Sequence, residues 1–144
     1  MLVTIEKIEW HDELLAMVVR CGHGEPGVNF ITPPENSIQL GILKHAQGSV
    51  IKAHIHKQRT RVIQNLHEVL FLQKGKLAAT FYDAAGKQVG ATVLNAGDVI
   101  LLLGGGHGFK VLEDASIFEV KQGPFAGTAE DKQILNVDDQ GKMP

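Results

Sequence analysis

The stretch Glu68-Val-Leu-Phe-Leu-Gln-Lys-Gly-Lys-Leu-Ala-Ala-Thr-Phe-Tyr82 consists of two short apolar runs separated by Lys74-Gly75. The runs, Val69–Gln73 and Leu77–Tyr82, have the length and the aliphatic and aromatic composition of strands. A Lys-Gly pair between two such runs is typical of a two-residue turn, because glycine adopts a positive φ without steric cost. The stretch therefore predicts a β-hairpin.

The turn in this hairpin determines which side chains share a face, because side chains alternate along a strand. The residues expected on one face are Glu68, Leu70, Leu72, Leu77, Ala79 and Phe81. Glu68 then lies opposite Phe81, and Phe81, Leu70 and Ala79 form a wall beside Glu68. Tyr82 is expected on the other face, pointing outwards.

Segments of the same kind recur along the chain, bounded by glycine, asparagine or aspartate turns. We expect further strands at Leu14–Arg20, Ser37–Leu43, Val50–His56, Gln88–Leu94, Val99–Leu103, Phe109–Leu112 and Ser116–Lys121, with a turn at Glu113-Asp114. Thr4–Trp10 alternates with period two and is expected to pair with Leu14–Arg20 as an N-terminal hairpin. Many short strands with regular turns are typical of an all-β sandwich or barrel.

The composition is that of one ordinary folded domain. The chain has 144 residues, of which 44% are hydrophobic and 21% charged, which is the usual balance for a globular protein. We expect a single domain over 1–144, with N-terminal strands at 2–20, a barrel core over about 37–121 and a polar tail at 125–144.

Charge and cysteine content exclude several classes of function. The formal net charge of -2 lacks the basic excess that nucleic-acid binding needs. The single cysteine, Cys21, cannot form an intrachain disulfide, which fits a reducing compartment. The first residues do not resemble a signal peptide, and the longest aliphatic runs are too short to span a bilayer. The chain is predicted to be cytoplasmic, with a small-molecule partner and neither a nucleic acid nor a membrane.

Histidines and a carboxylate follow one another in an order that suggests a metal site. His54 and His56 lie two residues apart in a predicted strand, so both imidazoles project from one face. Glu68 begins a hydrophobic strand, where an inward carboxylate needs compensation. His107 follows the strand that ends near Leu103 and a turn of three glycines. Three imidazoles and one carboxylate suit iron, manganese, nickel, cobalt or zinc, so one such divalent ion is the expected cofactor.

These motifs resemble those of the cupins, a family of small double-stranded β-helix, or jelly-roll, barrels. The residues that match the first cupin motif in order are Gly48, His54, His56, Glu68 and Gly75, and those at the ends of the second motif are Gly97 and His107. The resemblance covers about Gly48–Lys121. It implies a jelly-roll barrel with extra N-terminal strands and a metal bound by His54, His56, Glu68 and His107.

The chain departs from the cupin pattern at two places. Leu103 stands where the family usually has proline, and His107 arrives one residue early. The whole of Lys57–His67 separates His56 from Glu68, where the family has three or four residues. A continuous strand across that gap would hold the two ligands roughly 40 Å apart, so we expect Lys57–Leu66 to fold back as a hairpin.

Several other residues are candidates for contact with a substrate. Arg59 and Arg61 lie on the predicted hairpin, where they either meet an anionic substrate at the lip of the pocket or are simply solvated. Phe81 is expected to wall the pocket. Gln39 and Lys121 are polar residues on strands whose inner face the alternation leaves open.

Three functions are compatible with such a barrel, because fold alone does not define activity. The first is a metal-dependent enzyme, such as a dioxygenase or isomerase, acting on a small molecule, for example an anionic or a sugar-derived one. The second is a non-enzymatic module that senses a metal or small ligand. The third is a metal-independent sugar-nucleotide isomerase or epimerase, with a histidine base and a tyrosine acid. Tyr82 is the chain's single tyrosine.

An apolar stripe predicts a homodimer. If His54 and His56 face inwards, then Ile51, Ala53 and Ile55 face outwards on the same predicted strand. Monomers rarely expose large contiguous apolar patches. A second copy is therefore expected to cover the stripe across a two-fold interface, unless the N-terminal strands of the same chain cover it.

Overall fold

The computed structural model of the chain describes residues 4–137, so the predicted strand residues 2 and 3 and the tail residues 138–144 lie outside it. The chain divides into two compact units. The sheet unit comprises the described residues up to His23 and from Leu66 onwards, and the inserted unit is Gly24–Asn65. Two such units can belong to one domain, so the single-domain organisation stays a prediction.

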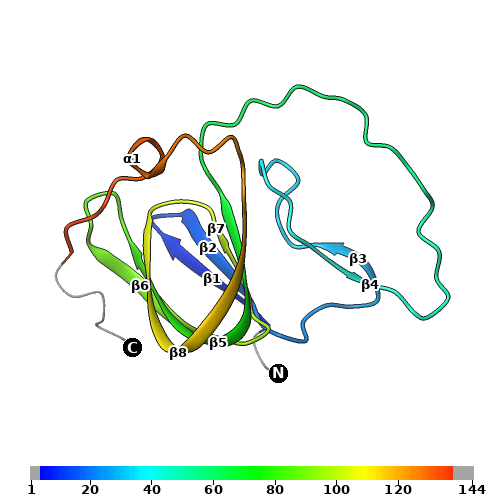
Figure 1. Cartoon of the computed structure of the whole chain (residues 1–144), viewed down its shortest axis with the longest axis horizontal. Coiled ribbons are helices and arrows are strands. Elements are labelled where there is room, and N and C mark those ends of the chain that lie inside the picture. Colours follow the sequence, from blue (N-terminus) through cyan, green and yellow to red (C-terminus); the bar gives the residue numbers. More distant parts are fainter. Residues whose placement is uncertain (1–3, 138–144) are drawn as a thin grey trace. The chain divides into compact units, whose positions relative to one another are not determined.

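The sheet unit is an antiparallel sheet that curls into a half-closed barrel (Figure 1). Its strands are β1 (Ile5–Trp10), β2 (Glu13–Val19), β5 (Glu68–Tyr82), β6 (Gln88–Asn95), β7 (Val99–Leu102) and β8 (Gly106–Lys121). Their order is β1-β2-β7-β5-β6, and β8 pairs with β5. The predictions of an all-β chain and of an N-terminal hairpin, β1 with β2, are confirmed.

Helix is limited to one short turn in the described part of the chain, α1 (Thr128–Asp131). It follows β8 and begins after Gly127. Among residues 4–137, no helix is long and apolar enough to cross a membrane.

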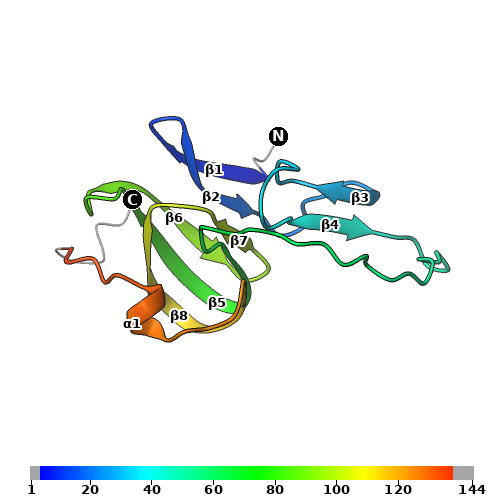
Figure 2. The same ribbon diagram turned by 90° about the horizontal axis from the view of Figure 1, so that it is seen from above.

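The predicted turns at Lys74-Gly75 and Glu113-Asp114 are wrong, because both positions lie inside long strands. β5 and β8 run alongside each other for their whole length (Figure 2). The two expected turns are paired: Gly75 has a φ of 88°, and a Cβ placed on it would lie 2.3 Å from the Asp114 carbonyl oxygen. The register shifts there, as in a β-bulge. Turn-forming residues therefore bend both strands together instead of reversing them.

The inner face of this bend carries the hydrophobic core. The residues of β5 that belong to the core are Leu72, Leu77, Ala79 and Phe81, and Leu70 packs against them. This is the set predicted to share a face, although the predicted hairpin is absent. The bulge around Gly75 shifts the alternation by one residue, so even-numbered positions before it and odd-numbered positions after it point the same way.

A polar network ties the N-terminal hairpin to the opposite side of the sheet. The Arg20 guanidinium donates to Asp98 Oδ2 at 2.9 Å and to the Val93 carbonyl at 2.7 Å, and it forms an ion pair with Glu6. Asp98 is buried and also accepts hydrogen bonds from the backbone N–H of Cys21. Each polar group buried here has a partner, so the network fixes how β1 and β2 join the sheet.

The inserted unit contains a single two-stranded ladder. β3 (Gly27–Phe30) pairs antiparallel with β4 (Gly41–Lys44), so the strand predicted at Ser37–Leu43 begins four residues late. Gln39 organises the loop between them. Its side-chain nitrogen donates to the carbonyls of Pro33 and Asn36 at 2.9 and 3.0 Å, and its oxygen accepts from the Thr32 hydroxyl.

The strand predicted at Val50–His56 and the hairpin predicted over Lys57–Leu66 are not formed. These residues adopt neither strand nor helix, and most of their side chains are exposed. The alternation of apolar residues is present in the sequence, but no neighbouring strand pairs with it. A β-strand gains its hydrogen bonds only from a partner, so the pattern alone does not produce one.

Candidate functional site

Glu68 and His107 form an ion pair on the inner face of the curled sheet. Glu68 Oε2 lies 3.2 Å from His107 Nε2, and the Glu68 side chain is only 8% exposed. The hydrogen bond from His107 is the main reason that the pKa of Glu68 falls to about 2. Burial acts in the opposite direction, while Glu119 and Lys132 add to the lowering. Glu68 is therefore held as a carboxylate.

The bend in β5 and β8 brings these two residues together from opposite ends of β5. Glu68 is the first residue of β5 and pairs with Leu102 of β7. His107, near the start of β8, pairs with Phe81 at the other end of β5. In a straight strand these ends would be roughly 43 Å apart, at about 3.3 Å per residue. Glu68 and His107 can therefore form an ion pair only because β5 and β8 are sharply curled.

The turn before His107 requires glycine for steric reasons. Gly105 has a φ of 63°, and a Cβ there would lie 2.6 Å from the Tyr82 carbonyl oxygen. A Cβ on Gly106 would lie 2.5 Å from Leu135 Cδ1. The glycine turn therefore lets β8 start close against β5 and lets a later segment pack on top of it.

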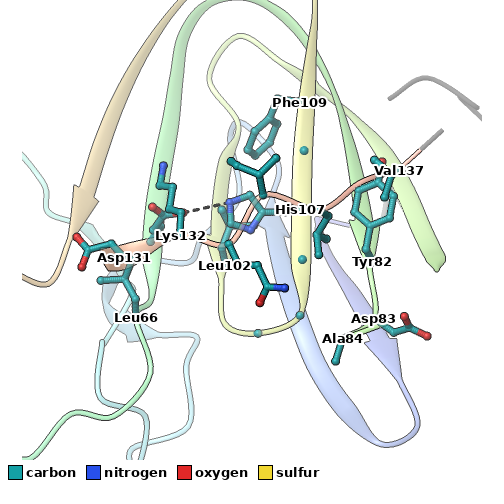
Figure 3. Close-up of a pocket in the computed structure, with 18 residues that line it drawn as sticks. Leu66, Tyr82, Asp83, Ala84, Leu102, His107, Phe109, Asp131, Lys132 and Val137 are labelled. Atoms are coloured by element: carbon teal, nitrogen blue, oxygen red, sulfur yellow. Dashed lines mark ion pairs between the residues drawn. The ribbon is translucent and has the colours of Figure 1, made fainter. Parts of the chain in front are cut away.

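The ion pair faces a cavity of about 670 Å³ in the sheet unit (Figure 3). Apolar side chains supply much of its wall, namely Leu66, Leu102, Phe109, Leu135 and Val137. A cavity of this size, mostly apolar with a few convergent polar groups, is typical of small-molecule sites.

The segment after β8 forms one side of this cavity, which the sequence did not reveal. Residues 131–135 and Val137 line it, although the region was predicted only as a polar tail. Leu135 packs over Gly106 and is half-buried. The signal available in the sequence is the apolar pair Ile134-Leu135 within an otherwise polar stretch.

The prediction that Tyr82 lies outside the pocket is wrong. Tyr82 is buried and is one of the residues that line the cavity. It pairs with Gly106, whose missing side chain leaves room for it beneath the segment that carries Leu135. Because Phe81 pairs with His107, alternation places Tyr82 on the face opposite Phe81, as predicted, yet Tyr82 and His107 both line the cavity.

His54 and His56 lie next to each other in the inserted unit. Their ring centroids are 5.1 Å apart and the rings are nearly perpendicular. His54 Nδ1 lies 2.8 Å from the Lys52 carbonyl oxygen. A backbone carbonyl in that position fixes the tautomer and leaves Nε2 as the donor atom for a metal. The rings are thus neighbours, as the sequence predicted, without the strand that was expected to place them.

The other residues that were predicted to contact a substrate are engaged elsewhere or lie outside the cavity beside Glu68 and His107. Phe81 is in the core and does not line the cavity. Lys121 faces the same side as Glu68, but it forms an ion pair with Glu119 at 3.5 Å. Arg59 and Arg61 lie on a shallow, exposed hollow of the inserted unit. Gln39 is engaged in its own loop.

The Glu68–His107 pair fits the ligand types and the spacing of a metal centre. Two ligand atoms about 2.1 Å from one ion, at an angle of about 90–109°, lie about 3.0–3.4 Å apart. The observed separation of 3.2 Å falls within that range. Within each unit, the residues described here hold no group of three or more His, Cys, Asp or Glu side chains around one position. Convergence of all four predicted ligands stays a prediction.

Comparisons do not place the chain in a known group: no protein-family model, curated protein or solved structure matches it. Function is therefore inferred from the chemistry of the site, which is the sounder basis in any case, because one fold hosts many activities.

Proposed function

We propose that the chain is a small metal-binding protein of the cupin type, which acts on a small molecule in the cavity beside Glu68 and His107. The observation that carries the proposal is the buried carboxylate paired with an imidazole on the cavity wall. His54 and His56 are proposed as the other two ligands, from their order in the sequence and their adjacent rings.

The chemistry of the pair supports a divalent transition metal. Metal ligands must be deprotonated, and Glu68 is already a carboxylate over the physiological range because its pKa is low. Neutral imidazole with carboxylate suits iron, manganese, cobalt, nickel or zinc. Such an ion supplies Lewis-acid or redox chemistry to a bound substrate. Glu68 and His107 would hold it at the cavity wall, and the apolar side chains of the wall would exclude water around the substrate.

The shape of the site favours an enzyme that acts on a small molecule over a purely structural metal centre. Structural sites are closed, whereas catalytic sites keep open positions. Here a cavity of about 670 Å³ adjoins the pair. A dioxygenase or an isomerase uses a site of this kind. A sensing module and a metal-independent sugar-nucleotide isomerase remain the alternatives, and the second would use His107 and Tyr82, which both line the cavity.

Metal analysis of the purified chain tests the proposal. Protein prepared without chelator or nickel resin is expected to contain about one equivalent of a single transition metal by mass spectrometry. Glu68→Gln and His107→Gln each remove one donor and should weaken metal binding at least about tenfold by calorimetry. His45→Ala, which removes an exposed histidine of the inserted unit, is the matched control. Metal-free protein that binds no transition metal when titrated overturns the proposal.

A second set of variants tests whether both units supply ligands. His54→Ala and His56→Ala should each weaken binding as strongly as His107→Gln if all four residues hold one ion. Stoichiometry separates the outcomes. One ion lost with any of the four variants supports a shared centre, while two ions lost independently by the two pairs contradict it.

A further inference from the structure

The segment that follows α1 brings a positive charge to the cavity. This charge takes no part in the Glu68–His107 ion pair. Lys132 lines the cavity from this segment. It is close enough to act electrostatically on the Glu68 carboxylate, and Figure 3 shows it beside the ion pair. Among residues 4–137, the ion pairs are made by other side chains, so no carboxylate lies within salt-bridge distance of the Lys132 ammonium.

The other charged residues of the cavity wall are accounted for. Glu68 is bound by His107 at 3.2 Å. Asp83 accepts hydrogen bonds from the backbone N–H groups of Ala85 and Lys87 at 3.0 and 2.9 Å, so it belongs to the turn between β5 and β6. Asp131 also lines the cavity, but its carboxylate carries a negative charge and does not attract an anion. Lys132 is therefore the charge in the wall that is available to a ligand.

The rest of the wall determines the body of that ligand. Leu66, Leu102 and Phe109 line the cavity together with the ion pair, and Leu135 packs over Gly106 from the same segment as Lys132. Apolar area of this kind favours a ligand with an apolar body.

We propose that Lys132 recognises an anionic group of the cavity's ligand, and that this ligand is a small organic anion with an apolar body. The inference rests on the cavity being the ligand site, as in the proposed function, but it does not require a metal. It assigns the recognition of the anion to the segment after α1, and not to Arg59 and Arg61 of the inserted unit.

Benzoate and its neutral isostere benzamide are suitable probes, because they differ only in charge. In titrations followed by ¹⁵N–¹H spectra, benzoate should shift the amide signals of Gly106, His107 and Leu135. Benzamide should bind about fivefold more weakly or not at all, the scale of one partly exposed charge pair. Equal affinity for the two probes overturns the proposal, as does binding of neither.

Variants of Lys132 identify the residue responsible. Lys132→Gln should lower the affinity for benzoate about fivefold and leave benzamide unchanged, and Lys132→Arg should keep the preference. Lys110→Gln, which removes an exposed lysine of β8 outside the cavity, is the control. Unchanged benzoate binding in Lys132→Gln contradicts the assignment.

Metal content measured on the same preparations separates this inference from the proposed function. Lys132→Gln should retain whatever metal the native chain binds, whereas Glu68→Gln should lose it. If the chain binds no metal but still binds benzoate more tightly than benzamide through Lys132, the proposed metal centre is excluded and the anion site is supported. If the chain binds metal but has equal affinity for benzoate and benzamide, the anion site is excluded and the metal centre is supported.

Discussion

The sheet unit and the inserted unit each contain a segment whose sequence predicts a strand, and only one of the two segments forms it. Val69–Gln73 is a short apolar run, whereas Val50–His56 alternates apolar with other residues, and both predict strands. The first lies in β5, where Leu72 is 1% exposed. The second forms no strand, and its Ile55 is 94% exposed.

The strands that are available for pairing account for the difference. The residues of β5 pair with β7 and β8 at one end and with β6 and β8 at the other. Residues 45–65 pair with no strand. Alternation tells which side chains share a face once a strand exists, but ladder hydrogen bonds and a covering core make the strand.

The largest expected difference between the units is in the cost of removing an aromatic ring. Phe81→Ala deletes a fully buried ring from the core of the sheet unit and should lower the free energy of unfolding by about 3–5 kcal/mol. Phe30→Ala removes a ring that is 60% exposed in the inserted unit and should cost less than about 1 kcal/mol. Urea denaturation followed by circular dichroism measures both. Equal losses would contradict the division into a packed unit and an open one.

A second pair of variants compares two glycines with similar, positive φ angles. Gly75 and Gly48 have φ values of 88° and 84°, so alanine is strained at both. Only at Gly75 does a Cβ also meet the backbone, 2.3 Å from the Asp114 oxygen, whereas nothing lies within 4 Å at Gly48. Gly75→Ala should therefore cost about 2–4 kcal/mol and Gly48→Ala about 1 kcal/mol. A similar midpoint shift for both would mean that the paired bend of β5 and β8 is not close-packed.

Much of the sheet unit was predictable because its signals are local. The N-terminal hairpin, β6 and β7 follow from alternation and turn residues. The face shared by Glu68 and Phe81 was also predicted, yet through a turn that does not exist. Glycine with positive φ serves equally in a hairpin turn and in a bulge. The contact between Gly75 and Asp114, which are distant in sequence, is what distinguishes the bulge from a hairpin turn.

Half of the candidate site was predictable, and the other half depends on tertiary packing. Glu68 and His107 were identified by residue type and position, and the structure brings them together. The contribution of Lys132 and Leu135 was missed, because nothing local in a polar tail shows that it returns to cover the start of β8. Tyr82 was misjudged for the same reason, since the segment that lines the cavity with it lies far along the chain.

The Glu68–His107 pair predicts an acid dependence confined to the sheet unit. The pKa of Glu68 is lowered from 4.5 to about 2 on folding, so the folded state favours the carboxylate. Its contribution to stability is complete above pH 4.5 and is lost as the pH falls towards 2, by an amount on the order of 1–3 kcal/mol.

Denaturation at pH 6 and at pH 3 measures this contribution. The native chain should lose more stability between these pH values than Glu68→Gln does. The exposed Glu35→Gln of the inserted unit controls for the general effect of removing a carboxylate. An identical acid loss in the native chain and in Glu68→Gln would show that the pair contributes nothing to folding.

The smallest expected change in the free energy of unfolding is at Ile55. This residue distinguishes a monomer, in which it is exposed to solvent, from a homodimer, in which a second copy covers it. Ile55 is 94% exposed, so Ile55→Lys should change the free energy of unfolding by no more than about 0.5 kcal/mol if the chain is a monomer. The predicted homodimer gives a different result, because Ile51, Ala53 and Ile55 would then be buried against a second copy.

Light scattering at micromolar concentration tests the homodimer. It should give twice 15.6 kDa for the native chain and 15.6 kDa for Ile55→Lys. Glu35→Lys, an equal change to lysine at another exposed position of the inserted unit, should leave the mass unchanged. A mass of 15.6 kDa for the native chain excludes the dimer and leaves the alternation of Val50–His56 as a pattern without a partner.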